Sequence, residues 1–303
     1  MKPHAISVET VVFGSVSLDL LQNPFYGSRA AAGGAGAYAA LGAAAVGGNV
    51  GLVGMISAAV PDDVRKALRS SLSATELHHV PTSTLAFDIH YNSHWEARYV
   101  TDETSGENGL AFEMAPKHFQ LARCFHVCPM HSLRDQLELV RALRRATSAE
   151  LLSVTSFGSR MSKTSVGARE LLESADVAFL NLAEALAITD TIDMEEALRV
   201  LAGVGRVVVI TLGRKGAVVI NGGKQSWIRA FDANVVDPTG AGEAFAGAFA
   251  VEYLHTGDLQ RAGILGACVA SFAVEGWGIA GLLTITADRI RTRLREEGLD
   301  KWL

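Results

Sequence analysis

The sequence contains little cysteine, proline or charge for its length. Three cysteines and seven prolines occur among 303 residues, and charged residues make up only 19% of the chain. A small, odd number of cysteines argues against a disulfide framework and is typical of a reducing compartment, so we expect a cytoplasmic protein. There is no excess of basic residues either. The net charge is −5, which disfavours nucleic acid and anionic membrane surfaces as partners.

Charge is absent altogether from residues 30–60, a run long enough to be weighed as a membrane span. Eight glycines interrupt this run, so it predicts a loop, a short buried helix near residues 38–46 and a strand near residues 50–56. A lone span without flanking basic residues would also be unusual. Residues 1–15 lack the pattern of a secretory signal. We therefore expect no membrane partner.

Strand-like and helix-like segments alternate along most of the chain. This rhythm predicts a parallel sheet with crossover helices in one α/β domain over residues 1–303. Ligands of such sheets bind at the carboxyl ends of the strands. Alternating apolar and polar residues predict a β-hairpin around residues 85–100, and helical spacing predicts a helix over residues 61–77. The two histidines at 78 and 79 lack further ligands at metal-site spacing, so no transition metal is expected.

The most informative stretch is residues 237–247, D-P-T-G-A-G-E-A-F-A-G. We expect it to follow a strand at residues 230–236 and to open a buried helix at residues 244–251. Glycines at a strand-to-helix turn let backbone N–H groups approach an anion, and the helix dipole adds to them. A carboxylate at Glu243 would then lie beside a bound phosphoryl group, where a general base acts on a hydroxyl. A tight turn with an acid placed to suit the dipole is the structural alternative.

This stretch resembles the C-terminal signature D-x-T-G-A-G-D of the ribokinase/PfkB family of carbohydrate and nucleoside kinases. The resemblance implies that Glu243 replaces the catalytic Asp as the base and that the glycine turn forms an anion hole. It also implies that the first Asp and the Thr can help to hold a monovalent cation such as K⁺. The residues that match the signature are Asp237, Thr239, Gly240, Ala241 and Gly242, of which the last three would form the anion hole.

Two earlier segments resemble the substrate-binding motifs of the same family. Asp19 ends a G-x-x-x-x-D segment, whose acid binds substrate hydroxyls in the family. Gly33 and Gly34 begin a segment similar to G-G-x-x-x-N-x-A, in which Tyr38 stands where the family has a substrate-contacting Asn. Because a phenol cannot reproduce the paired donor and acceptor of an amide, the hydroxyl pattern that is recognised should differ from that of ribose. A loop cap for Asp19 and a core position for Tyr38 are the structural alternatives.

Two later segments resemble the nucleotide-binding motifs. Asn181 and Glu184 match N-x-x-E, in which the pair arranges Mg²⁺ and the triphosphate, often through water. A helix capping box is the structural alternative for this pair. Thr211, Gly213 and Gly216 match a T-x-G-x-x-G loop, which implies that they contact the nucleotide. A β-hairpin at that loop is compatible with nucleotide binding.

The resemblance implies a ribokinase-like three-layer α/β/α fold with a mainly parallel sheet and a small β lid, formed by about residues 15–32 and 83–110. In the family such a lid covers the substrate and often serves as a dimer interface. Arg98 is therefore a candidate substrate residue, and a homodimer through the lid is a candidate assembly. A solvated strand position is the structural alternative for Arg98.

The function implied by the resemblance is phosphorylation, by ATP and Mg²⁺, of a hydroxyl group on a small sugar, cyclitol, polyol or nucleoside. The alternative is a weak or inactive kinase homologue that binds a nucleotide or another small molecule without turnover. This alternative arises because the chain departs from the family pattern at both Tyr38 and Glu243.

Overall fold

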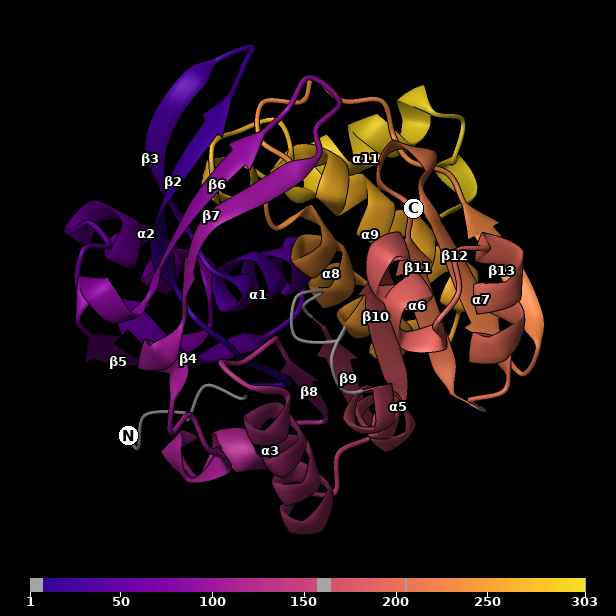
Figure 1. Cartoon of the computed structure of the whole chain (residues 1–303), viewed down its shortest axis with the longest axis horizontal. Coiled ribbons are helices and arrows are strands. Elements are labelled where there is room, and N and C mark those ends of the chain that lie inside the picture. Colours follow the sequence, from indigo (N-terminus) through magenta and orange to yellow (C-terminus); the bar gives the residue numbers. More distant parts are fainter. Residues whose placement is uncertain (1–7, 157–164, 205, 303) are drawn as a thin grey trace.

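A nine-stranded sheet forms the centre of the protein (Figure 1), in a computed structural model that describes residues 8–156, 165–204 and 206–302. The strand order is β13-β12-β11-β10-β9-β8-β1-β4-β5, with parallel pairing from β5 across to β11 and antiparallel pairing at β11–β12 and β12–β13. The strands are β1 (Thr10–Phe13), β4 (Val50–Ser57), β5 (Ala74–Val80), β8 (Cys124–Val127), β9 (Leu151–Thr155), β10 (Val177–Asn181), β11 (Val207–Thr211), β12 (Ala217–Asn221) and β13 (Lys224–Ile228). The sheet is thus mainly parallel, as the sequence predicts.

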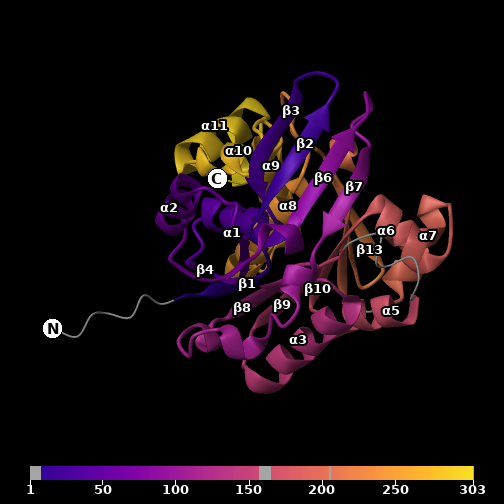
Figure 2. The ribbon, with the colours of Figure 1, turned by 60° about the vertical axis from the view of Figure 1, so that its left-hand side comes forward.

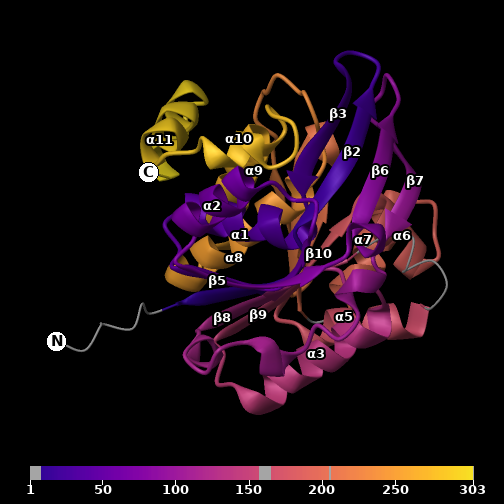
Figure 3. The same cartoon turned by 90° about the vertical axis from the view of Figure 1, so that its left-hand side faces the viewer.

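Helices cover both faces of this sheet (Figures 1 and 3). One layer consists of α1 (Ala35–Ala45), α8 (Ala241–Thr256) and α9 (Leu259–Ala273), with α2 (Asp62–Ser71), α10 (Ala280–Leu283) and α11 (Ala287–Glu296) packed outside it. The opposite layer consists of α3 (Leu133–Ala146), α5 (Ser165–Ser174), α6 (Leu182–Thr189) and α7 (Met194–Ala202). Short 3-10 helices are η1 (Thr82–Thr84), η2 (Ser105–Glu107), η3 (Phe112–Met114), η4 (Phe119–Leu121), η5 (Gly213–Lys215) and η6 (Asp300–Trp302). The three-layer α/β/α architecture is confirmed.

The core has two parts because the central strands are buried on both faces. In β1, Val12 faces one apolar cluster, whereas Val11 and Phe13 face the other, as expected for a parallel sheet covered on both sides. The uncharged run at residues 30–60 supplies helix α1, strand β4 and the end of a further strand, β3 (Gly27–Gly33). In the described parts of the chain, no helix is both long and apolar enough to cross a membrane.

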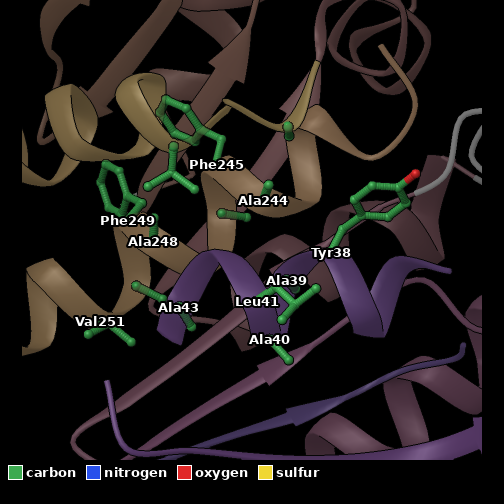
Figure 4. Close-up of a cluster of buried hydrophobic side chains, with 14 of the residues drawn as sticks. Tyr38, Ala39, Ala40, Leu41, Ala43, Ala244, Phe245, Ala248, Phe249 and Val251 are labelled. Carbon is green, nitrogen blue, oxygen red and sulfur yellow. The ribbon is translucent and has the colours of Figure 1, made fainter. Parts of the chain in front are cut away.

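Helices α1 and α8 lie against each other through small residues (Figure 4). A Cβ atom at Gly247 would lie 1.9 Å from the carbonyl oxygen of Ala39, and one at Gly42 would lie 2.3 Å from the carbonyl oxygen of Ala244. Only glycine allows the two backbones to approach this closely. The small-residue composition of both helices therefore fixes their separation, and with it the position of the first turn of α8.

A separate four-stranded sheet stands away from the main sheet (Figures 2 and 3). Its order is β3-β2-β6-β7, with β2 (Ser17–Asn23), β3 (Gly27–Gly33), β6 (Ala86–Tyr91) and β7 (Ala97–Glu103). Alternation along these strands gathers Leu21, Ala31 and Ile89 into a small apolar cluster. The strands arise from the two segments for which the sequence predicts a lid, and we call this sheet the lid below.

The helix predicted over residues 61–77 is wrong in its second half. Helix α2 ends at Ser71, and Leu72 has an extended backbone with φ −111° and ψ 152°. Residues 74–80 then form strand β5, which pairs in parallel with β4. The apolar spacing that suggested the helix is that of Val64, Leu68 and Leu72, which all pack on the same core although Leu72 lies just beyond the end of α2.

The strand predicted at residues 230–236 is also wrong, because this segment is irregular. Its end is held by single hydrogen bonds rather than by a neighbouring strand. The Val236 and Asp237 N–H groups both donate to the carbonyl oxygen of Val274, at 2.8 and 3.2 Å. Asn23 of the lid donates from Nδ2 to the carbonyl oxygen of Val236 at 3.1 Å. The glycine turn before α8 is thereby attached to both α9 and the lid.

Candidate active site

A cavity lies where the lid meets the first turns of α1 and α8. It brings together residues from both ends of the chain, including most of the predicted substrate and catalytic residues. The lining residues are Ser15, Asp19, Gly34, Ala35, Tyr38, Phe87, Ile89, Tyr99, Thr104, Glu107, Pro129, Thr239, Gly240 and Glu243.

The turn before α8 depends on Gly240, which has φ 72°. A Cβ atom there would lie 2.2 Å from the ring of Tyr38, so the turn needs glycine for both its conformation and its packing. The Ala241 N–H donates to the Pro238 carbonyl oxygen at 3.3 Å and closes the turn. A Cβ atom at Gly242 would meet nothing within 4 Å. Of the three predicted anion-hole residues, Gly242 therefore faces open space, whereas the Ala241 N–H is engaged within the turn.

Glu243 lies in the first turn of α8 and lines the cavity. Burial raises the pKa of its carboxyl group, and a hydrogen bond from its own backbone N–H partly opposes that shift. Within the described ranges, no hydrogen bond or ion pair joins Glu243 to another side chain. An acid that is desolvated, faces a cavity and stays near a helix N-terminus has the properties of a general base.

Asp19 is on β2 and is only 2% exposed. Burial raises its pKa to about 7, and the charge of Asp237 adds to the shift, while the nearby Ser17 side chain and Phe87 backbone reduce it. A Cβ atom at Gly33 would lie 2.4 Å from Asp19 Oδ2, so this glycine of the G-G motif allows strand β3 to pack against the carboxylate. Oδ1 of Asp19 has no hydrogen-bond partner among the described residues.

Tyr38 is 1% exposed and packs its ring against Gly240. Its hydroxyl points away from the apolar contact between α1 and α8 (Figure 4). That hydroxyl is buried and has no hydrogen-bond partner in the described parts of the chain. Burial, followed by the charges of Asp237 and Asp19, raises the pKa of the phenol, so it is neutral and can donate a hydrogen bond. A buried polar atom without a partner is rare and calls for an explanation.

Asp237 and Thr239 form a junction between the lid and α8. Oδ1 of Asp237 accepts from the Thr239 N–H at 3.0 Å and from the Thr239 hydroxyl at 2.6 Å, and Oδ2 accepts from the Gly278 N–H at 2.8 Å. The Thr239 hydroxyl also pairs with Tyr91 of the lid at 2.7 Å. Burial raises the pKa of Asp237. Because both oxygens of the Asp237 carboxylate accept hydrogen bonds from these groups, the carboxylate has a structural role in this arrangement.

Asn181 and Glu184 form a complete capping box at the start of α6, so the structural alternative for this pair is present. Glu184 is 4% exposed. Its Oε2 accepts from the Ser156 hydroxyl at 2.7 Å and from the Asn181 N–H at 2.9 Å, and its Oε1 accepts from Asn181 Nδ2 at 2.8 Å. This network holds Glu184 in one position at the carboxyl end of β10. A carboxylate held in this way suits Mg²⁺ through an intervening water rather than as a direct ligand.

The predicted nucleotide loop lies at the carboxyl end of the neighbouring strand. Thr211 is in register with Asn181 across β10 and β11. Gly213 has φ 57° and open space where a side chain would be. A Cβ atom at Gly216 would lie 1.9 Å from the Ile228 carbonyl oxygen, so this glycine serves the hairpin that leads into β12. Of these two glycines, Gly213 thus has open space beside it among the described residues, whereas Gly216 is closely packed.

Arg98 does not line the cavity and is exposed on β7. Its neighbour Tyr99 lines the cavity instead, since successive side chains of a strand point to opposite faces. Phe87 and Glu107 also line the cavity without having been singled out from the sequence. The alternation of side chains along the hairpin strands could have identified Phe87 and Tyr99 as residues that face the cavity. Glu107 lies in a polar loop without periodicity, so no comparable signal exists for it.

Comparisons with known proteins identify the family and the fold. The model of the pfkB family carbohydrate kinases matches residues 28–283. Cytidine kinase from Thermococcus kodakarensis is 32% identical over 282 residues, which cover 89% of this chain and 98% of that protein. The structure of adenosine kinase from Sinorhizobium meliloti superposes with a TM-score of 0.78 at 19% identity, over 96% of this chain and 99% of that one. Aminoimidazole riboside kinase from Salmonella enterica superposes with a TM-score of 0.73 at 19% identity, over 94% of this chain and 99% of that one.

The two superpositions show a shared fold, and the family match and the near-full-length relative show descent. The chain therefore belongs to the pfkB family of carbohydrate kinases.

Proposed function

We propose that this protein transfers the γ-phosphoryl group of ATP to a hydroxyl group of a small polyhydroxy acceptor, and that the acceptor is a nucleoside. The observation that carries the kinase reaction is the position of Glu243 beside the open cradle at Gly242, in a cavity that also contains Asp19 and Tyr38. The nucleoside class is supported by the resemblance to cytidine kinase over nearly the whole chain.

In this reaction Glu243 accepts the proton of the attacking hydroxyl group. Burial holds the pKa of Glu243 above its ordinary value, which makes it a stronger base, provided that the pH is high enough for it to be ionised. The backbone N–H groups at the start of α8 and the helix dipole stabilise the charge that develops on the transferring group. Asp19 and Tyr38 hold hydroxyl groups of the acceptor.

The metal is proposed to act at the nucleotide end. Mg²⁺ neutralises phosphate oxygens when it is bound, and Glu184 and Asn181 would hold it through water. Thr211, Gly213 and Gly216 would contact the nucleotide, with Gly213 the most open of them. A role for Asp237 and Thr239 in binding K⁺ would require their present hydrogen bonds to rearrange. A comparison of turnover in K⁺ and in a tetraalkylammonium salt tests that role.

Glu243 is one methylene longer than the Asp of the family signature. Its intrinsic acidity is similar, about 4.3 against 3.9, so the chemistry is retained. A displacement of roughly 1 Å in a reacting group can reduce the rate about 100-fold. We infer that the acceptor lies correspondingly further from α8 than in relatives with Asp. Tyr38 is in a position to set that distance, because its ring lies against Gly240.

The experiment is ADP release from ATP and Mg²⁺ with a panel of nucleosides, sugars and cyclitols. It compares this protein with Glu243→Asp, Glu243→Gln and the exposed control Glu113→Gln. Loss of a general base lowers the rate by about 100- to 10,000-fold, so Glu243→Gln should lose turnover while Glu113→Gln retains it. Binding of nucleotide without turnover by this protein, together with turnover by Glu243→Asp, would instead identify a non-catalytic binding module.

The outer surface of the lid is proposed to pair two copies of the chain. Leu20 on β2 and Val100 on β7 are 43% and 52% exposed. Sedimentation velocity of this protein and of a Leu20→Lys variant measures the association. A monomer at micromolar concentration would contradict the proposal.

A further inference from the structure

The lid is joined to the glycine turn before α8 by hydrogen bonds from two of its strands. Asn23 on β2 donates from Nδ2 to the carbonyl oxygen of Val236 at 3.1 Å. The hydroxyl oxygens of Tyr91, the last residue of β6, and Thr239 lie 2.7 Å apart. Thr239 immediately precedes Gly240 and lines the cavity, whereas Tyr91 does not line it. The bond of Tyr91 therefore reaches the turn from outside the cavity, and contact with the acceptor does not explain it.

The direction of this hydrogen bond follows from the other bonds of Thr239. The Thr239 hydroxyl donates to Oδ1 of Asp237 at 2.6 Å, and the Thr239 N–H donates to the same oxygen at 3.0 Å. A hydroxyl group has a single hydrogen to donate, so the phenol of Tyr91 is the donor and Oγ1 of Thr239 is the acceptor. Burial raises the pKa of this phenol, so it keeps its hydrogen at neutral pH. An aligned chain of hydrogen bonds thus runs from the lid through Thr239 to Asp237.

Contacts within the lid itself hold Tyr91 in place. Its ring packs on the small apolar cluster of the lid, and its ring centroid lies 6.1 Å from that of Trp95. Trp95 reaches this position because the hairpin turn gives it a left-handed backbone with φ 64°, a conformation that is uncommon for a bulky residue. The hydroxyl of Tyr91 is therefore presented to the turn in a defined orientation.

Strand β6 contacts both the acceptor cavity and the glycine turn. Phe87 and Ile89 line the cavity, and Tyr91 follows on the same face, since all three pack on the same lid cluster and alternate residues of a strand share a face. Each residue of a strand adds about 3.3 Å, so Tyr91 meets the turn roughly 7 Å beyond Ile89. The proposed anion cradle at Gly242 follows Thr239 by one helical turn. One strand thus connects the wall of the acceptor cavity to the turn.

We propose that Tyr91 is a positioning residue for phosphoryl transfer: its hydrogen bond to Thr239 fixes the glycine turn relative to the lid, and with it the distance between the transferring phosphoryl group and the acceptor. This inference rests on the proposed kinase function and adds to it a residue outside the cavity. A displacement of roughly 1 Å in a reacting group can reduce the rate about 100-fold, so partial loosening of the turn should lower kcat about tenfold. The acceptor KM should be unchanged, because Tyr91 does not line the cavity.

Initial rates of ADP release test the inference with Tyr91→Phe, which removes the hydroxyl and keeps the ring. The matched control is Tyr26→Phe, the same change at a tyrosine that is 48% exposed in the turn between β2 and β3. At saturating ATP and Mg²⁺ we expect Tyr91→Phe to lower kcat about tenfold with an acceptor KM within about twofold of the unmodified chain, and Tyr26→Phe to leave both unchanged. A kcat within about twofold of the unmodified chain, or a loss confined to KM, would overturn the inference.

A double-mutant cycle with Thr239→Val shows whether Tyr91 acts through Thr239. Thr239→Val removes the hydroxyl at the other end of the bond, so it should lower kcat at least as much as Tyr91→Phe does. Adding Tyr91→Phe to Thr239→Val should then lower kcat by less than about twofold more. A further loss of about tenfold would overturn the assignment to this bond. An unchanged kcat in Thr239→Val would also overturn it, even if Tyr91→Phe does not fold.

Hydrogen exchange separates this inference from the proposed reaction. Without ligands, the backbone amides of residues 236–242 should exchange about fivefold faster in Tyr91→Phe than in the unmodified chain and in Tyr26→Phe, while exchange in α3, on the opposite face of the sheet, is unchanged. Faster exchange of the turn in a protein that releases no ADP with any acceptor would retain the bond between lid and turn and reject the kinase function. ADP release with unchanged kcat and unchanged exchange in Tyr91→Phe would retain the kinase function and reject the inference.

Discussion

Replacing Tyr38 with Phe should make the protein more stable and its acceptor binding weaker. The Tyr38 hydroxyl is buried and has no hydrogen-bond partner in the described parts of the chain. A buried polar group left unsatisfied costs roughly 1–3 kcal/mol, so deleting it should raise the free energy of unfolding by about 1 kcal/mol or more. In a chain of 303 residues each kcal/mol corresponds to an increase in Tm of about 1.5–2 °C. The same deletion removes a hydrogen bond to the acceptor, which should raise KM about fivefold.

The matched control for this experiment is Tyr91→Phe. The Tyr91 hydroxyl bonds to Thr239 at 2.7 Å, so its deletion should lower the free energy of unfolding by about 1 kcal/mol. Thermal unfolding without ligands measures both variants, and initial rates with the best acceptor measure KM. A lower Tm for Tyr38→Phe, with KM unchanged, would show that the hydroxyl is satisfied within the protein and would refute the reasoning.

Three further predictions concern the first turn of α8, the α1–α8 contact and a buried histidine. Gly242→Ala should leave Tm nearly unchanged, because its Cβ atom meets nothing within 4 Å, but should lower kcat about 100-fold by filling the anion cradle; an unaltered kcat would place the phosphoryl group elsewhere. Gly247→Ala should lower the free energy of unfolding by about 1–3 kcal/mol, because its Cβ atom would lie 1.9 Å from the Ala39 carbonyl oxygen. Chemical denaturation measures this loss against Gly203→Ala, whose Cβ atom would lie 3.2 Å from its nearest neighbour, and equal losses would contradict the close packing. Burial lowers the pKa of His126 from 6.5 to about 3, so the unfolded chain binds a proton that the folded chain excludes. Acidification from pH 6.5 to pH 4 should therefore reduce the free energy of unfolding by roughly 3 kcal/mol, and His126→Gln, which cannot be protonated, should show a smaller reduction in the same titration.

Local sequence patterns were sufficient for the main layers of the fold. Strands such as β11 are short apolar runs with β-branched residues, and helices such as α3 have a clear apolar stripe. The secondary structure of each such segment can therefore be predicted from its own residues. The two wrong assignments concern segments whose state depends on distant partners. Residues 74–80 form a strand because they pair with β4. Residues 230–236 do not form a strand, because the backbone groups at the end of this segment form hydrogen bonds with the end of α9 and with the lid.

The position of Glu243 beside the glycine turn was predictable for a related reason. The turn at Gly240 and the carboxylate at Glu243 belong to one continuous stretch, in which the position of each residue follows from helix geometry. The lid side of the cavity was only partly predictable. Arg98 and Tyr99 are neighbours in the sequence, but only Tyr99 lines the cavity, and the register of the lid strands decides which of them does.

The sequence by itself therefore determined the alternation of strands and helices, the glycine turn before α8 and the family to which the chain belongs, because each of these follows from the local order and spacing of residues. Only the tertiary structure decided that Glu107 joins Asp19 and Glu243 in one cavity, and that the hydroxyl of Tyr38 has no hydrogen-bond partner among the described residues. Both facts depend on how the lid lies over α1 and α8. Such contacts join residues far apart in the chain, where no periodicity or spacing relates one to the other.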